Sequence, residues 1–318
     1  MKLLITSPAF CAPLLSELID YAKTLVDEVV VNPHGKTLKE EELIELWDGV
    51  DGIVAGVEVY SKNLLSKAPK SLKVISRYGV GYEAIDLKAA KDMDIKVTNT
   101  PGVNADAVAD LTLGLMLSIA RKIPQYDASV KAGKWGRYVG CGLNEKVLGI
   151  VGMGAIGKKV ARRALGFDME ILAYDPFFDE EFAKMNGIVK STIQEILEKS
   201  DFVTLHMPVT NETKNLINEE SLKKMKKTAY LVNAARGPLV DEDALYNALK
   251  NNQIAGAALD VFETEPLYES PLFTLDNIVV QPHLGGHTEE ASIKMGKMAI
   301  DNAVAVLRGE ACKFVVNK

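Results

Sequence analysis

Short apolar runs of strand length alternate along the chain with longer segments in which apolar residues recur at helical spacing. The strand-like runs cover residues 3–5, 29–31, 52–56, 72–75, 95–98, 147–151, 171–174, 202–205, 229–233, 254–259 and 278–280. The clearest helical patterns cover residues 13–25, 38–46, 105–123, 241–250 and 289–307. This alternation predicts an α/β fold in which parallel sheets are covered by helices on both faces.

The segment 105–123 is more apolar than the other helical patterns. It carries Val108, Leu111, Leu113, Leu115 and Met116 within nine residues. Such a pattern predicts a helix that is buried on all sides, as at a domain or subunit interface. A helix inside one domain core is the alternative, and we favour a subunit contact.

Length and composition restrict the class of protein. At 318 residues, two domains are expected, and 47% hydrophobic with 25% charged residues is typical of a globular protein. A net charge of −6 argues against nucleic-acid binding. Cys11, Cys141 and Cys312 are scattered, which predicts neither disulfides nor a metal site and fits a cytoplasmic location. No stretch has the apolar length of a signal peptide or a membrane span.

A glycine turn lies between two of the predicted strands. The run 147–151 ends in Gly152-Met-Gly154-Ala-Ile-Gly157, a helical pattern follows, and the run 171–174 ends at Asp175. This order of strand, glycine turn, helix, strand and acid is the dinucleotide-binding fingerprint. The free N–H groups at the start of the helix can bind a pyrophosphate, and Asp175 can accept the ribose hydroxyls. Because a carboxylate repels a 2′-phosphate, the pattern favours NAD over NADP.

Polar residues follow the ends of the later strands. His206, Arg236, Asp260 and His283 each lie at or just after a predicted strand end. Parallel strands of one sheet end at the same edge, so we expect these side chains to converge on the cofactor crevice. Arg236 can bind a carboxylate through two parallel hydrogen bonds, and His283 can exchange a proton near neutral pH. A carboxylate near His283, such as Glu265, would orient the imidazole, although spacing alone does not establish that contact.

An earlier loop also follows a strand end. Residues 77–81, Arg-Tyr-Gly-Val-Gly, can present backbone N–H groups to an anion, although an ordinary turn is the alternative reading.

Several motifs in a fixed order resemble one family. GMGAIG with its downstream Asp, NAARG, FETEP and QPHLGG, together with RYGVGYEAIDL, are similar to the D-isomer-specific 2-hydroxyacid dehydrogenases over nearly the whole chain. The resemblance implies two Rossmann-like lobes with doubly wound parallel sheets. Residues 1–99 and 288–318 would form a discontinuous substrate-binding domain, and residues 100–287 an NAD-binding domain. The family usually forms homodimers.

The resemblance also implies site roles. Arg236, Glu265 and His283 would be catalytic, with Arg236 binding the substrate carboxylate, and the backbone of Val80 and Gly81 would bind substrate too. Arg137 matches a phosphate-directed arginine. The cofactor contacts are expected at Gly152, Gly154, Ala155, Ile156, Gly157, Asp175, His206, Pro208, Thr213, Ala234, Asp260, Gly285 and Gly286.

The substrate is a small 2-hydroxyacid or 2-ketoacid whose identity the sequence leaves open. The general pattern resembles phosphoglycerate dehydrogenases, but Ala55-Gly56 stands where that branch commonly has an arginine. The prediction is therefore a 3-phosphoglycerate dehydrogenase-like enzyme without a regulatory domain. A reductase of glyoxylate, hydroxypyruvate or another 2-ketoacid is the alternative. A second alternative is a non-catalytic NAD-binding regulator on the same fold.

Overall fold

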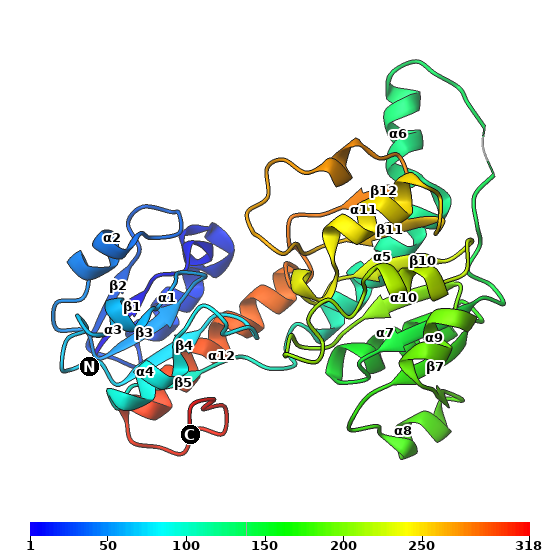
Figure 1. The fold of residues 1–318 in the computed structure, drawn as a ribbon. Helices are drawn as coiled ribbons and strands as arrows, with labels where there is room; N and C mark the ends of the chain where they lie inside the picture. Colours follow the sequence, from blue (N-terminus) through cyan, green and yellow to red (C-terminus); the bar gives the residue numbers. More distant parts are fainter. Residues whose placement is uncertain (138) are drawn as a thin grey trace. The chain divides into compact units, whose positions relative to one another are not determined.

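A computed structural model describes residues 1–137 and 139–318 (Figure 1). Its contacts divide the chain into two compact units. The first comprises Met1–Asn104 and His287–Lys318, and the second comprises Ala105–Gly286. Each unit is built on one parallel sheet, which confirms the predicted class of two α/β lobes.

The first unit contains five parallel strands in the order β2-β1-β3-β4-β5. The strands are β1 (Lys2–Ile5), β2 (Glu28–Val31), β3 (Gly52–Ala55), β4 (Val74–Arg77) and β5 (Lys96–Thr98). The α-helices are α1 (Ser16–Lys23), α2 (Glu40–Glu45), α3 (Lys62–Leu65), α4 (Leu87–Asp92) and α12 (Glu289–Leu307). Two short 3₁₀ helices, Pro8–Cys11 and Pro13–Leu15, precede α1.

The last part of the chain returns to the first unit. Helix α12 packs on β3 and β4, and the Ser76 hydroxyl donates a hydrogen bond to the carbonyl of Ala299 at 2.7 Å. Val315 forms an antiparallel bridge with Thr98 of β5, and the Asn317 side chain accepts from the amide of Val97 at 2.8 Å. The final residues thereby cover the edge strand of this sheet.

The second unit contains seven parallel strands in the order β12-β11-β10-β9-β6-β7-β8. The strands are β6 (Val147–Val151), β7 (Glu170–Tyr174), β8 (Val189–Lys190), β9 (Phe202–Leu205), β10 (Tyr230–Asn233), β11 (Gly256–Leu259) and β12 (Ile278–Val280). The helices are α5 (Ala105–Arg121), α6 (Ile123–Lys131), α7 (Ala155–Leu165), α8 (Glu180–Met185), α9 (Ile193–Lys199), α10 (Glu219–Lys224) and α11 (Glu242–Lys250). Two 3₁₀ helices are Gly237–Leu239 and Pro271–Thr274.

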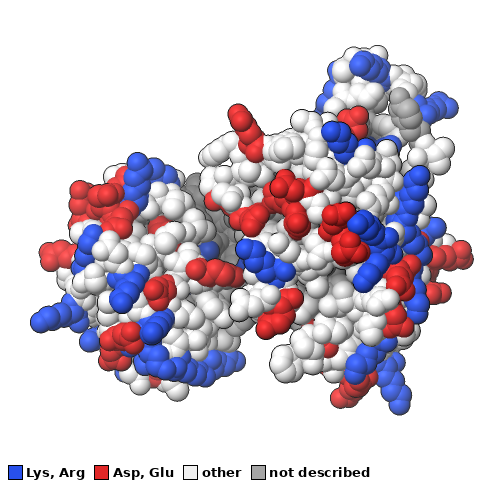
Figure 2. All heavy atoms as spheres, viewed as in Figure 1, with Lys and Arg blue, Asp and Glu red and all other residues white. Residues whose placement is uncertain are grey.

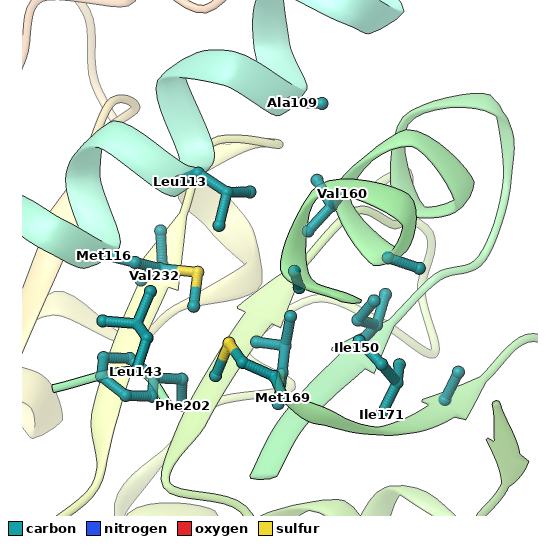
Figure 3. Close-up of a cluster of buried hydrophobic side chains, with 14 of the residues drawn as sticks. Ala109, Leu113, Met116, Leu143, Ile150, Val160, Met169, Ile171, Phe202 and Val232 are labelled. Carbon is teal, nitrogen blue, oxygen red and sulfur yellow. The ribbon is translucent and has the colours of Figure 1, made fainter. Parts of the chain in front are cut away.

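Successive side chains of a strand point to opposite faces of the sheet. The strands of this unit therefore contribute side chains to two separate buried clusters. Phe202 and Val232 belong to one buried cluster, whereas Val203 and Leu231 belong to the other. Figure 3 shows the first cluster, where Leu113 and Met116 of α5 and Val160 of α7 lie above strand residues such as Ile150 and Phe202.

Two predictions about helices need correction. Helix α5 is not buried on all sides, because Asp106 and Asp110 are exposed and pair with Arg163 of α7. It ends at Arg121, and a second helix, α6, follows that the sequence pattern did not predict.

Candidate active site

The glycine turn after β6 has the shape that the sequence predicted. Gly152 has φ +100°, and a Cβ there would lie 2.6 Å from the carbonyl carbon of His206. A Cβ on Gly157 would lie 2.2 Å from the carbonyl oxygen of Gly152, so α7 packs directly on the turn. A Cβ on Gly154, in contrast, would meet no atom within 4 Å. No side chain caps the start of α7, so the backbone at Gly154 and Ala155 is open to an anion.

Asp175 braces this turn from the end of β7. Its Oδ2 accepts a hydrogen bond from the amide of Met153 at 2.8 Å, and its Oδ1 accepts from the amide of Phe177 at 2.7 Å. Each carboxylate oxygen has two lone pairs, so both can still accept from a ribose hydroxyl. The link to Met153 was not predicted, and it shows that Asp175 also fixes the glycine turn.

The end of β9 lies directly beside the turn. The His206 Nε2 lies 3.0 Å from the Thr204 hydroxyl, while its Nδ1 is buried with no hydrogen-bond partner among the residues described. Burial lowers the pKa of His206 to about 3, so the ring is neutral at physiological pH. The following loop is closed by Thr213, whose hydroxyl donates to the carbonyl of Pro208 at 2.8 Å.

His206 therefore gives a testable pH dependence of stability. In the unfolded chain its pKa is near the ordinary 6.5, whereas the folded ring is protonated only near 3. As the pH falls, the unfolded state therefore binds a proton before the folded state does. The contribution of neutral His206 to the free energy of unfolding is complete above pH 6.5 and is lost as the pH falls toward 3. Asn does not titrate, so the His206→Asn variant should lose less stability than the unsubstituted protein as the pH is lowered. We therefore expect the melting temperature of the variant minus that of the unsubstituted protein to rise through this range. Calorimetry over a pH series measures it, and a constant difference would contradict the assignment.

Arg236 lies in a tight turn after β10. The Asn233 side chain donates to the carbonyl of Arg236 at 2.8 Å and accepts from the amide of Ala235 at 3.1 Å. A Cβ on Gly237 would lie 1.8 Å from the carbonyl carbon of Phe262, so this turn touches the loop after β11. Ala234 and Ala235 are buried. The turn therefore leaves no room for a side chain at Gly237.

The loop after β11 places the Glu265 side chain in contact with His283. Glu265 Oε2 lies 2.6 Å from His283 Nδ1, and Glu265 Oε1 accepts from the amide of Phe262 at 2.8 Å. Burial raises the pKa of Glu265, but these hydrogen bonds and the charges of His283 and Arg236 outweigh it and hold that pKa below its usual value. The carboxylate is thus ionised and oriented toward the imidazole at neutral pH.

Asp260 supports the other side of His283. The amide of His283 donates to the carbonyl of Asp260 at 2.7 Å, and the buried carboxylate accepts from the amides of Leu284 and Gly285 at 2.7 and 2.8 Å. His283 itself has φ +58°, a left-handed conformation that is uncommon outside glycine. Asp260 therefore fixes the backbone that presents His283, which the sequence did not predict.

Glu242 was also missed. From the first turn of α11, its Oε1 accepts from the amide of Glu263 at 2.6 Å, next to the Phe262 amide that Glu265 holds. Burial raises the pKa of Glu242, and the nearby acids Glu263, Asp243 and Glu265 raise it further. The helical pattern predicted from residue 241 placed the helix start correctly, with Asp241 as its cap, but no local signal indicated this contact with the loop.

The other residues that the sequence predicted for the site are divided between the two units. Val80 belongs to the first unit, and its carbonyl accepts from the Asn99 side chain at 2.8 Å; Gly81 follows it, half-buried. Arg137 lies after α6 on an exposed segment and makes no ion pair with a described residue. Ile156, Gly285 and Gly286 lie in the second unit, on α7 and after β12.

Within the described part of the chain, no group of three or more His, Cys, Asp or Glu is arranged to hold a metal ion, and no helix is long and apolar enough to cross a bilayer.

Comparison with known proteins gives consistent matches. A family model described as "D-isomer specific 2-hydroxyacid dehydrogenase, NAD binding domain" matches residues 113–285. A D-3-phosphoglycerate dehydrogenase of Methanocaldococcus jannaschii is 43% identical over all of this chain, which spans 59% of the length of that protein. A glyoxylate reductase of Thermococcus litoralis is 44% identical over 87% of this chain and 86% of its own length. The crystal structure of the TT0316 protein from Thermus thermophilus superposes with a TM-score of 0.88 at 36% identity, covering 99% of this chain and 100% of that one. The chain therefore belongs to the D-isomer specific 2-hydroxyacid dehydrogenase family.

Proposed function

We propose that this protein is an NAD-dependent oxidoreductase that interconverts a D-2-hydroxyacid and the corresponding 2-ketoacid. The observation that carries the proposal is the Glu265–His283 pair, joined at 2.6 Å in the unit that also holds the open glycine turn. The family match to an NAD-binding domain supports a nicotinamide cofactor. In this proposal His283, Glu265 and Arg236 act on one substrate.

The proposed chemistry assigns one task to each residue. Arg236 binds the substrate carboxylate through its planar guanidinium. Protonated His283 donates its proton to the carbonyl oxygen in reduction, and neutral His283 accepts the hydroxyl proton in oxidation. Glu265 orients the imidazole through Nδ1, which leaves Nε2 for the substrate. When bound in the glycine turn, the nicotinamide cofactor supplies the hydride chemistry.

The experiment is an initial-rate assay of NADH oxidation with a panel of 2-ketoacids. Glyoxylate, hydroxypyruvate, pyruvate and 3-phosphohydroxypyruvate cover the substrates suggested by the sequence and by the names of the relatives. Turnover of at least one member is expected. NADH binding without turnover of any member would instead favour a non-catalytic regulator on the same fold.

The preference for NAD rests on Asp175 and gives a second prediction. Asp175→Asn removes the charge that repels a 2′-phosphate while nearly keeping the side-chain shape. We expect the ratio of kcat/KM with NADPH to that with NADH to rise by about tenfold or more, the scale of one charged hydrogen bond. Glu170→Gln, an exposed change at the start of the same strand, is the matched control. An unchanged ratio in Asp175→Asn would remove Asp175 from cofactor selection.

We also propose that the protein forms a homodimer through the region of α5 and α6. Helix α6 has no buried residue and stands away from the sheet of its unit (Figure 1). Ile123 and Val130 are each 51% exposed, and Trp135 nearby is 78% exposed. Together with Leu117 and Tyr126, Ile123 and Val130 form the apolar part of a groove that Arg121 and Asp127 also line. A large exposed apolar surface of this kind is typical of an interface, and light scattering on the purified protein should give twice the mass of one chain.

A further inference from the structure

One peptide group of the loop after β11 is held by a side chain that has no part in the proposed reaction. The amide of Glu263 donates to Oε1 of Glu242, in the first turn of α11, at 2.6 Å. The preceding amide, that of Phe262, donates to Oε1 of Glu265 at 2.8 Å. Two carboxylates therefore hold neighbouring amides of this loop. One comes from a helix, and the other belongs to the residue that contacts His283.

The peptide between Phe262 and Glu263 also lies against the turn of Arg236. A Cβ on Gly237 would overlap both the carbonyl group of Phe262 and the amide nitrogen of Glu263. The Phe262 ring is buried and packs edge-on against Phe273, with ring centroids 5.9 Å apart. Apolar packing fixes the place of the ring but is not directional, so it does not set the orientation of the peptide plane. The hydrogen bond from Glu263 does set that orientation.

Helix α11 gives Glu242 a fixed base. The helix cap, Asp241, accepts from the amide of Ala244 at 2.9 Å, and its own amide donates to the carbonyl of Ile217 at 2.8 Å. Leu245 of the same helix is buried in the core of the unit. A carboxylate that extends from this base can hold the loop peptide in one orientation.

The charges around Glu242 are acidic. Burial raises the pKa of Glu242, and the charges of Glu263 and Asp243 and then of Glu265 raise it further. Partial burial of a carboxylate beside other acids is unfavourable in itself, and perturbed acids of this kind are concentrated at functional sites. The contact with the loop is therefore more than a surface hydrogen bond.

The charges around His283 explain why the loop orientation matters. Glu265 Oε2 lies 2.6 Å from His283 Nδ1, and the carbonyl of Asp260 accepts from the His283 amide at 2.7 Å. Although burial raises the pKa of Glu265, its hydrogen bonds and the charges of His283 and Arg236 lower it overall. An ionised Glu265 favours the protonated imidazole only while it stays aligned with Nδ1.

We propose that Glu242 is a positioning residue for the Glu265–His283 pair. It holds the loop peptide in the orientation that keeps the Glu265 carboxylate on His283 Nδ1. Glu242 acts through Glu265 and not on the substrate. The inference rests on the proposed function, which assigns the proton transfer to His283, and it adds a residue to that assignment.

The test compares Glu242→Asp with Glu242→Gln. Asp keeps the charge but withdraws the carboxylate by one methylene, whereas Gln removes the charge and keeps an oxygen acceptor at the same reach. With NADH and the best 2-ketoacid of the panel, Glu242→Asp should lower kcat by about tenfold, the scale of one charged hydrogen bond. KM should stay nearly the same, because Asn233 holds the turn of Arg236 independently. Glu242→Gln should keep most of kcat.

The matched control is Glu181→Asp. It is the same chemical change on an exposed acid in the first turn of α8, in the same unit. It should alter neither kcat nor KM.

Two further measurements distinguish positioning from a general loss of structure. In Glu242→Asp, the decline of kcat/KM for reduction should begin at lower pH, because His283 loses its proton more readily without an aligned Glu265. In Glu242→Gln, it should begin where it does in the unsubstituted protein. Amide hydrogen exchange at Glu263, measured without cofactor, should be faster in Glu242→Asp than in either of these two proteins.

The outcomes separate the two proposals. Unchanged kinetics in Glu242→Asp, or an equal loss of kcat in Glu242→Gln, would overturn the role of Glu242 while the dehydrogenase function stands. A loss of kcat in Glu242→Asp without a shift in the pH profile would also overturn it, since a general structural effect predicts that result. Turnover of no 2-ketoacid by the unsubstituted protein, despite NADH binding, would overturn the proposed function and this inference with it.

Discussion

Replacing His283 by Asn is expected to lower kcat for 2-ketoacid reduction by about 10²–10⁴-fold, the usual contribution of a positioned acid or base. Asn can still form hydrogen bonds at this position but cannot exchange a proton near neutral pH. KM should change little, because Arg236 rather than His283 is proposed to bind the substrate carboxylate. Steady-state rates with NADH and the best 2-ketoacid of the panel provide the measurement.

The control for this substitution is His287→Asn. His287 lies four residues further along, is exposed, and has no proposed role, so its rates should be unchanged. Glu265→Gln should give an intermediate loss, since Gln retains one hydrogen bond to the imidazole but not the charge. Wild-type rates in a folded His283→Asn would remove His283 from the mechanism.

Arg236→Lys is expected to lower kcat/KM for the 2-ketoacid by about 100-fold while the dissociation constant for NADH changes less than about threefold. Lysine keeps the charge but loses the planar fork that binds a carboxylate through two parallel bonds. A loss of about 3 kcal/mol, typical of a charge-assisted pair, corresponds to roughly two decades. The two constants come from steady-state kinetics and from titration of NADH fluorescence.

Arg121→Lys is the matched control, because Arg121 is an exposed arginine at the end of α5 in the same unit. It should alter neither constant. A collapse of NADH affinity in Arg236→Lys, with KM for the 2-ketoacid retained, would mean that Arg236 belongs to the cofactor site.

The parts of the fold that the sequence predicted are those governed by local patterns. The glycine turn is one, because the positive φ of Gly152 and the contact of Gly157 with its carbonyl allow no side chain. The start of α11 is another, since Asp241 accepts from the amide of Ala244 in an ordinary helix cap. The strands were found because buried parallel strands are continuous apolar runs.

Long-range hydrogen bonds were not predictable from the chain alone. The amide of Met153 donates a hydrogen bond to Asp175, and the amide of Leu284 donates one to Asp260, so each bond joins positions more than twenty residues apart. The apolar character of α5 predicted burial on all sides, but the ion pairs of Asp106 and Asp110 show that one side faces charged partners. The hydrogen bonds that hold the site in place and the exposure of one face of α5 both depend on tertiary packing, which local sequence patterns do not show.

Charge placement across the surface likewise needed the structure. Figure 2 shows Lys and Arg side chains interspersed with Asp and Glu on the face in view. Neither this distribution nor the net charge of −6 indicates that Glu58, which follows β3, is only 2% exposed. Its Oε1 has no hydrogen-bond partner within the described chain, which only coordinates reveal.

The arrangement of the proposed site can be observed in a crystal structure of the protein with NADH and oxamate, an unreactive analogue of a 2-ketoacid. We expect the oxamate carboxylate within hydrogen-bond distance of the Arg236 guanidinium and its carbonyl oxygen at hydrogen-bond distance from His283 Nε2. We expect the pyrophosphate of NADH on the turn from Gly152 to Gly157. Oxamate bound away from both Arg236 and His283, or NADH bound away from that turn, would contradict it.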